Sequence, residues 1–288
     1  MTARKMTAAA ILVLWLGAVG WYAARLYLQP EAERVARAAR TLPPGVAYYA
    51  AYRADRQVGW ARSRLDTLPA ASGFILSDLL EVDASGPGPT GDVRLEAETR
   101  LGPSLDLDRF RITTRGLLGG VSARGMVSGD SLLEITVAGP TDTTRRTLPL
   151  EGGVVPATAL PLRLAAAGLP EVGDRIGVPS FDPLGMRPTT VEIEVLERSI
   201  RSYPDSAVRD PGTGDWRTAR RDTVLAWRVA RDVSGLTVEA WVDEDGRILD
   251  ARVGDELRLE RTAFELAYFG RPGVAAGEDA DEARGGGE

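Results

Sequence analysis

The side chains of this chain that could do chemistry are hydroxyls and carboxylates, because the sequence contains no histidine and no cysteine. Without them there is no Ser-His-Asp triad, no thiol nucleophile and no zinc site built from Cys and His. The nearest approach to a nucleophile elbow is residues 120–124 (GVSAR), where Ser122 lacks the closing glycine and a histidine partner. Acid–base work would therefore fall to Asp, Glu or Tyr.

The carboxylates form no specific catalytic or metal pattern. Residues 243–246 (DEDG) resemble the start of a calcium loop, but Arg247 occupies the next ligand position, so we expect a hairpin turn there. A glycosidase needs two carboxylates at a defined separation, and 41 acidic residues supply many chance pairs. We predict no catalytic, cofactor or metal site, and a protein that is not an enzyme.

The balance of acidic and basic residues limits which macromolecules the protein is expected to bind. Lys and Arg total 35 against 41 Asp and Glu, for a net charge of −6. Nucleic acid is excluded as an expected partner, because phosphate binding requires a net basic face. With no disulfide available, the body must be stabilised by packing alone.

Residues 6–24 are the first long stretch without a charge, and Arg4 and Lys5 precede it. As a helix this stretch would span about 28 Å, close to the ~30 Å hydrocarbon core of a bilayer. It is longer than the apolar core of a cleaved signal peptide, and Tyr22 stands where a cleavage site needs a small residue. An uncleaved membrane anchor is therefore favoured over a signal peptide or a buried core helix.

The end of this segment carries residues suited to a membrane boundary and to helix contacts. Aromatic rings and a guanidinium favour the membrane–water interface, while a wide ring at depth and small residues four apart suit helix–helix packing. The membrane or partner contacts that we predict are Trp15, Gly20, Trp21, Tyr22, Ala24, Arg25 and Tyr27.

The orientation of the anchor has two interpretations. A literal count of Lys and Arg, two before the segment and four in residues 25–40, would place the body in the cytoplasm. A short basic tail before an apolar helix is instead the layout of an uncleaved export signal, and long domains translocate largely regardless of charge. We favour a bacterial inner (cytoplasmic) membrane protein, single-pass, with a periplasmic body.

The body reads as mainly β. Residues 92–101 alternate between apolar and charged side chains, and the alternation shifts phase between Leu107 and Phe110, which predicts a bulge. Residues 236–242 and 247–253 flank the DEDG turn as a hairpin. We predict nine to eleven strands in a curved antiparallel sheet (a half-barrel, open barrel or sandwich), with one transmembrane helix and one or two short helices.

The domain organisation follows from these segments. Residues 1–28 form the tail and transmembrane helix, 29–41 a stalk helix, 42–272 the β-rich extracytoplasmic domain, and 273–288 a disordered acidic tail. Gly and Pro recur in 152–188, around a short helix at 160–167. That region either divides two subdomains or caps one sheet, and we favour one continuous sheet.

A set of aromatic residues and one irregular stretch are candidates for binding. Tyr48, Tyr49, Tyr52, Trp60, Trp227 and Trp241 are expected to pack in the core or, alternatively, to face an apolar groove. Residues 201–222 read as an irregular stretch, a solvated hairpin tip or a partner loop. Its candidate contact residues are Trp216, Arg217, Arg220 and Arg221.

The pattern at Val58-Gly59-Trp60, the strands after it and the late segment WVDEDGRILDA resemble envelope domains of the lipoprotein-carrier (LolA/LppX-like) half-barrel type. The resemblance implies a strongly curved antiparallel sheet that wraps a helix and offers an apolar groove. The tether that we predict differs from those released or lipidated carriers, and no binding residue is transferred.

Two functions remain at this stage. The first is a non-catalytic accessory subunit, whose transmembrane helix docks in an envelope, respiratory or photosynthetic membrane protein complex while its β-domain braces that complex outside. The alternative is a tethered binder of a lipid or another hydrophobic ligand. No cofactor is expected in either.

Overall fold

The computed structural model describes residues 30–83, 92–116, 120–129, 131–168, 170–182, 187–233, 236–254 and 257–270. The predicted transmembrane helix and the acidic tail after residue 273 lie outside these ranges. Among the helices within them, none is long and apolar enough to cross a bilayer.

The described chain forms one sheet of fifteen strands, in the order β8-β7-β6-β5-β4-β3-β2-β1-β15-β14-β13-β12-β11-β10-β9. Every neighbouring pair is antiparallel except β9 and β10. The strands are β1 (Gly45–Arg53), β2 (Arg56–Thr67), β3 (Phe74–Asp83), β4 (Asp92–Leu101), β5 (Leu107–Arg115), β6 (Val121–Ser128), β7 (Leu132–Ala138), β8 (Thr143–Pro149), β9 (Val155–Pro156), β10 (Arg175–Asp182), β11 (Arg187–Arg209), β12 (Trp216–Val233), β13 (Leu236–Asp243), β14 (Ile248–Val253) and β15 (Leu257–Thr262).

The first and last strands meet in the middle of the sheet. Tyr48 of β1 lies opposite Thr262 of β15, so β1–β8 run outward on one side and β15–β9 on the other. The prediction of a mainly antiparallel β fold is confirmed. The predicted strand number was too low, and residues 201–209 and 216–222, expected to be irregular, belong to the long strands β11 and β12.

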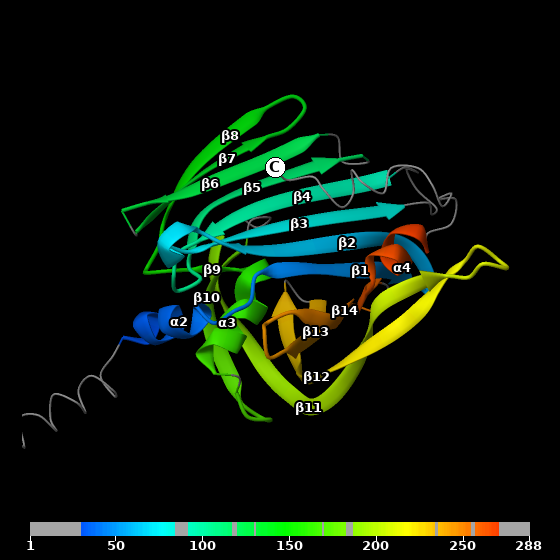
Figure 1. The fold of residues 1–288 in the computed structure, drawn as a ribbon. Coiled ribbons are helices and arrows are strands. Elements are labelled where there is room, and N and C mark those ends of the chain that lie inside the picture. The colour runs from blue at the N-terminus through cyan, green and yellow to red at the C-terminus, as the bar shows by residue number, and fades with distance from the viewer. Residues whose placement is uncertain are drawn as a thin grey trace, which may run out of the picture.

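The sheet is strongly curved but does not close. In Figure 1, β1–β8 form one wall and β10–β13 sweep round to face it. The two walls meet through side-chain packing and a backbone hydrogen bond: the rings of Phe110 and Phe181 are 5.7 Å apart, and the Leu107 N–H donates to the Val154 carbonyl at 2.8 Å. These contacts, rather than a ladder between the edge strands β8 and β9, hold the ends of the described sheet together.

Three short α-helices, α2 (Glu31–Ala39), α3 (Leu160–Ala167) and α4 (Phe264–Phe269), complete the described body. Helix α3 lies between the two walls and packs Leu160 and Leu164 into the main core, where Val35 of α2 joins them. It ends at Gly168, whose φ of 94° provides the left-handed C-cap. Helix α4 covers the opposite face of the sheet, over Trp60 of β2.

Several local predictions agree with the structure. The strand at 92–101 is β4, a helix, α2, lies within the predicted segment 29–41, and the helix at 160–167 is α3. Helix α2 packs Val35 and Ala39 into the main core. The register of β4 against β5 shifts between Arg100 and Leu101, which leaves Asp108 as the extra residue of the predicted bulge.

Candidate functional site

An apolar cavity of about 280 Å³ lies inside the curved sheet, between the concave face of β1–β4 and helix α3. The turn between β13 and β14 and part of β15 complete its wall. The lining residues are Gly45, Ala47, Tyr49, Ala61, Ser63, Leu65, Leu76, Asp78, Leu79, Leu80, Leu95, Thr158, Pro161, Leu162, Gly246, Arg247, Ile248 and Leu259.

The alternation of side chains along the strands explains why this wall is apolar. In β3, Leu76 and Leu80 point to the concave face, while Leu79 packs against α4 on the other side. Ala47 and Ala61 stand on the same concave face in β1 and β2. Because alanine leaves space that a larger side chain would fill, the centre of the sheet stays open beneath α3.

Asp78 interrupts this apolar face. It stands between Leu76 and Leu80 on β3 and directly opposite Ser63 of β2. Its Oδ2 is inaccessible to solvent and has no hydrogen-bond partner within the described part of the chain. Burial raises the pKa of the Asp78 carboxyl to about 6, and a hydrogen bond with the Ser63 side chain opposes that rise.

The other polar groups of the cavity have assigned tasks or stay neutral. Burial raises the pKa of the Tyr49 phenol, which therefore remains protonated at physiological pH. Arg247 lines the same cavity and donates from Nη2 to the Pro43 carbonyl at 3.2 Å, which ties the β13–β14 turn to the segment before β1.

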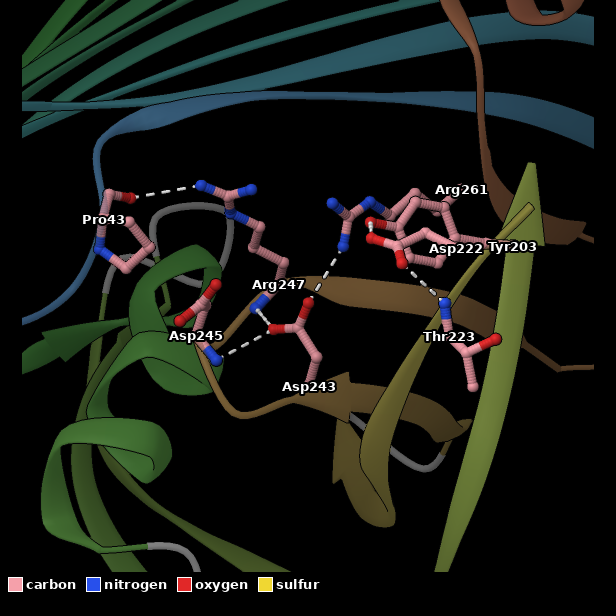
Figure 2. A network of polar contacts seen from close by, with 8 residues as sticks. All are labelled: Pro43, Tyr203, Asp222, Thr223, Asp243, Asp245, Arg247 and Arg261. Carbon is pink, nitrogen blue, oxygen red and sulfur yellow. Dashed lines mark hydrogen bonds and ion pairs between the residues drawn. The ribbon is translucent and has the colours of Figure 1, made fainter. Parts of the chain in front are cut away.

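A second buried carboxylate, Asp243, anchors that turn (Figure 2). Its Oδ1 accepts the backbone N–H groups of Asp245 and Arg247 at 3.1 and 2.8 Å, and its Oδ2 accepts Arg261 Nη1 at 2.9 Å. The side chains of Asp243 and Arg261 are only 6 % and 9 % exposed. The Arg261 guanidinium also lies 4.0 Å from the centre of the Tyr203 ring. This pattern is structural: it joins β13, β15 and β11.

The aromatic residues singled out in the sequence divide between these roles. Tyr48 and Trp60 pack edge-on against Phe264 of α4, at 5.1 and 6.3 Å, so they belong to the core on the face away from the cavity. Tyr49 lines the cavity. An arginine guanidinium lies over each of the other three rings: Arg258 over Tyr52, Arg198 over Trp227 and Arg201 over Trp241.

The residues of the expected partner loop lie at the start of β12, not in a loop; the connection itself is residues 210–215. Trp216 stacks on Phe269 of α4, with ring centres 5.8 Å apart. The arginines pair across to β11 and its end: Arg217 with Asp210, Arg220 with Asp205, and Arg221 with Ser202. The contacts predicted for Trp15, Gly20, Trp21, Tyr22, Ala24, Arg25 and Tyr27 lie outside the described residues.

Sequence reasoning missed Asp78. The signal was present, since Asp78 occupies an inward position in the alternation of Phe74, Leu76 and Leu80. Its partner across the strands, Ser63, had no signal in the sequence, because the pairing depends on the register of β2 against β3. Among the described residues, no group of three or more acidic side chains is placed to hold a metal ion.

Comparisons with known proteins support the fold. No family model matches the chain, and no curated protein matches its sequence. The structure is similar to the crystal structure of a beta-barrel-like protein of the domain of unknown function DUF1849 from Brucella abortus, at 16% identity and a TM-score of 0.50 over 77% of this chain and 97% of that one. A DUF1089 family protein from Pseudomonas aeruginosa matches at 10% identity and a TM-score of 0.38, over 70% of this chain and 94% of that one. The first likeness identifies the fold as β-barrel-like.

Proposed function

We propose that this protein is a membrane-tethered, extracytoplasmic binder of a hydrophobic ligand, held in the cavity between the concave face of β1–β4 and helix α3. The observation that carries the proposal is the lining itself, formed by Ala, Leu and Ile from six strands and covered by α3. Concave apolar sites with a few convergent polar groups are the usual form of small-molecule pockets.

The size of the cavity limits the ligand. A volume of about 280 Å³ lies just below the roughly 300–1,000 Å³ of typical ligand pockets. It suits one medium-length hydrocarbon chain rather than a two-chain lipid. The curved sheet around a helix is also what the resemblance to lipoprotein carriers implies, and a lipid-like cargo is consistent with it.

The test is binding of decanol to the full chain in lipid nanodiscs, measured by calorimetry with the heats for empty nanodiscs subtracted. Ala61→Phe should abolish binding, because the ring would occupy the cavity. Ala207→Phe adds the same volume to the distal part of β11 and should leave binding unchanged. Unaltered binding in a folded Ala61→Phe variant, or no binding by the parent chain, would reject the proposal.

A second candidate function, an accessory subunit of a membrane complex, is favoured by the β11–β12 hairpin. Pairing with β13 begins at Ala226, so the distal hairpin extends beyond β13. It exposes 71 % of Ile200 and 42 % of Val208, beside its arginine pairs. We infer that a partner protein covers the apolar side chain of Ile200, the most exposed large hydrophobic residue of the described chain.

Extraction in mild detergent followed by native sizing tests this candidate. A large assembly that Ile200→Glu disrupts would support it, and a monomer would contradict it. A reporter active only in the periplasm, fused to the C-terminus, tests the proposed single-pass inner-membrane orientation, and an inactive fusion would reverse it.

A further inference from the structure

We propose that the hydrophobic ligand carries a protonated primary amine, and that Asp78 recognises it inside the apolar cavity. The inference rests on the proposed function, since it assigns the chemical class of the ligand for the same cavity. It starts from the position of the Asp78 carboxyl group, which lies in a cavity wall formed mostly by aliphatic side chains.

The position of Asp78 gives the first argument. A carboxylate on the concave face of β3, between Leu76 and Leu80, contributes nothing to apolar packing. One of its oxygens has no partner within the described chain. Rotation about the terminal torsion of an aspartate is soft, so either oxygen can turn towards a donor in the cavity.

The charges around Asp78 give the second argument. The effects that determine its ionisation are burial and the hydrogen bond of Ser63. Arg62 of β2 lines a cleft together with Asp78, but alternation directs its side chain to the α4 face, as it does Trp60. Arg261, opposite Tyr49, pairs with Asp243 at 2.9 Å, and Arg247 donates to the Pro43 carbonyl. A buried carboxylate is stabilised most by a cation that also donates hydrogen bonds, and a ligand ammonium provides both.

The neighbours of Asp78 predict a simple pH dependence. Other elements also contribute polar groups to the cavity: Tyr49 on β1, Ser63 on β2, Thr158 before α3 and Arg247 in the turn. The Asp243–Arg261 pair lies next to Tyr49, because Arg261 of β15 is opposite Tyr49 of β1. Burial keeps the Tyr49 phenol protonated over the range of interest. Binding of an amine should therefore weaken as the pH falls below 6 and Asp78 takes up its proton.

The experiment compares decylamine, decanol and decanoate with the full chain in nanodiscs at pH 7.5. Decylamine should bind at least about tenfold more tightly than decanol, since hydrogen bonds to a charged group are about twice as strong as neutral ones. Decanoate should bind most weakly. In Asp78→Asn the preference for the amine should fall below about threefold, with decanol binding retained. Asp66→Asn, which removes an exposed carboxylate from β2, should behave as the parent chain.

Each outcome has one meaning. Equal binding of decylamine and decanol by the parent chain, or an amine preference that survives in Asp78→Asn, overturns the inference while leaving the proposed function intact. No binding of decanol rejects the proposed function itself. Asp78→Leu provides a second variant, because an aliphatic side chain suits this wall and should also lose the preference. Nanodiscs with and without lysophosphatidylethanolamine, which has a primary amine and a single acyl chain, separate a membrane lipid from a free amine as the source: competition with decylamine identifies the lipid, and its absence identifies a free amine.

Discussion

Two aspartates of the curved sheet have carboxylate oxygens that are shielded from solvent, but the surroundings of these oxygens are opposite. Asp243 accepts two backbone N–H groups and the Arg261 guanidinium, so each of its oxygens has a partner. Asp78 faces an aliphatic cavity, and its Oδ2 has no partner in the described chain. The same residue type therefore stabilises the fold in one place and costs stability in the other.

The contrast shows how burial and pairing act separately. Burial raises the pKa of Asp243 as it does that of Asp78, but at Asp243 the Arg247 N–H and the Arg261 charge oppose the rise. A paired carboxylate fixes a turn, whereas an unpaired one is available to a ligand.

The largest effect is expected from breaking the Asp243–Arg261 pair. Asp243→Ala would leave the Arg261 charge buried without a partner and release two N–H groups of the turn. We expect the free energy of unfolding to fall by about 3–5 kcal/mol, measured by urea denaturation. Asp66→Ala, which breaks an exposed pair with Arg64, should cost less than about 1 kcal/mol. A double variant with Arg261→Met should recover much of the loss, and equal costs for Asp243→Ala and Asp66→Ala would contradict a structural role.

The next effect concerns the dependence of stability on pH at Asp78. Its pKa in the folded state, about 6, exceeds the ordinary 3.8, so the native carboxyl keeps its proton to a higher pH than the unfolded one. The folded protein should therefore lose stability as the pH rises from about 4 to above 6. The loss is up to about 3 kcal/mol, at 1.36 kcal/mol per pKa unit, and less where cavity water screens the carboxylate.

Urea denaturation of the parent chain and of Asp78→Asn across pH 4–7 measures this contribution. The difference between the two curves should open over that window, with the variant more stable at pH 7. Parallel curves would show that Asp78 titrates normally and has no special surroundings.

The comparison also shows what the sequence could predict. Local alternation predicted β4 and the β13–β14 hairpin, and the Pro and Gly boundaries predicted α3, because each depends on residues close in the chain. The partner of Asp243 is Arg261, 18 residues further on, and the cavity joins β1–β4 with α3 and β15. These depend on strand order and curvature, which no local pattern contains. Asp78 was visible as a break in an apolar alternation, but only the structure shows the cavity that it faces.

A smaller effect is expected at Gly246, which holds the Asp243 turn against α3. Its φ is +73°, and an added Cβ would lie 2.6 Å from Leu162 Cα and 2.8 Å from the Pro161 carbonyl oxygen. Gly246→Ala should therefore cost about 2–3 kcal/mol, from left-handed strain plus displacement of the turn. Gly254→Ala is the matched control: its φ is +58° and an added Cβ has nothing within 4 Å. It should cost about 1 kcal/mol, and an equal cost at both glycines would show that the turn does not press on α3.

The smallest effect is expected from removing the hydrogen bond between Ser63 and Asp78. Ser63 lies opposite Asp78, and its hydrogen bond lowers the pKa of the carboxyl. Ser63→Ala should therefore move that pKa above 6 and reduce stability at pH 7 by about 1 kcal/mol, with a smaller loss at pH 4, where the carboxyl is protonated. The pKa can be followed by carboxyl-carbon NMR of the labelled chain.

Ser77→Ala, at the adjacent position of β3, is the control. It should leave the pKa of Asp78 unchanged, because alternation directs the Ser77 side chain to the opposite face of the sheet. A Ser63→Ala titration that coincides with the parent curve would mean that burial alone sets the charge of Asp78, and the carboxyl would then be still more dependent on a ligand for its partner.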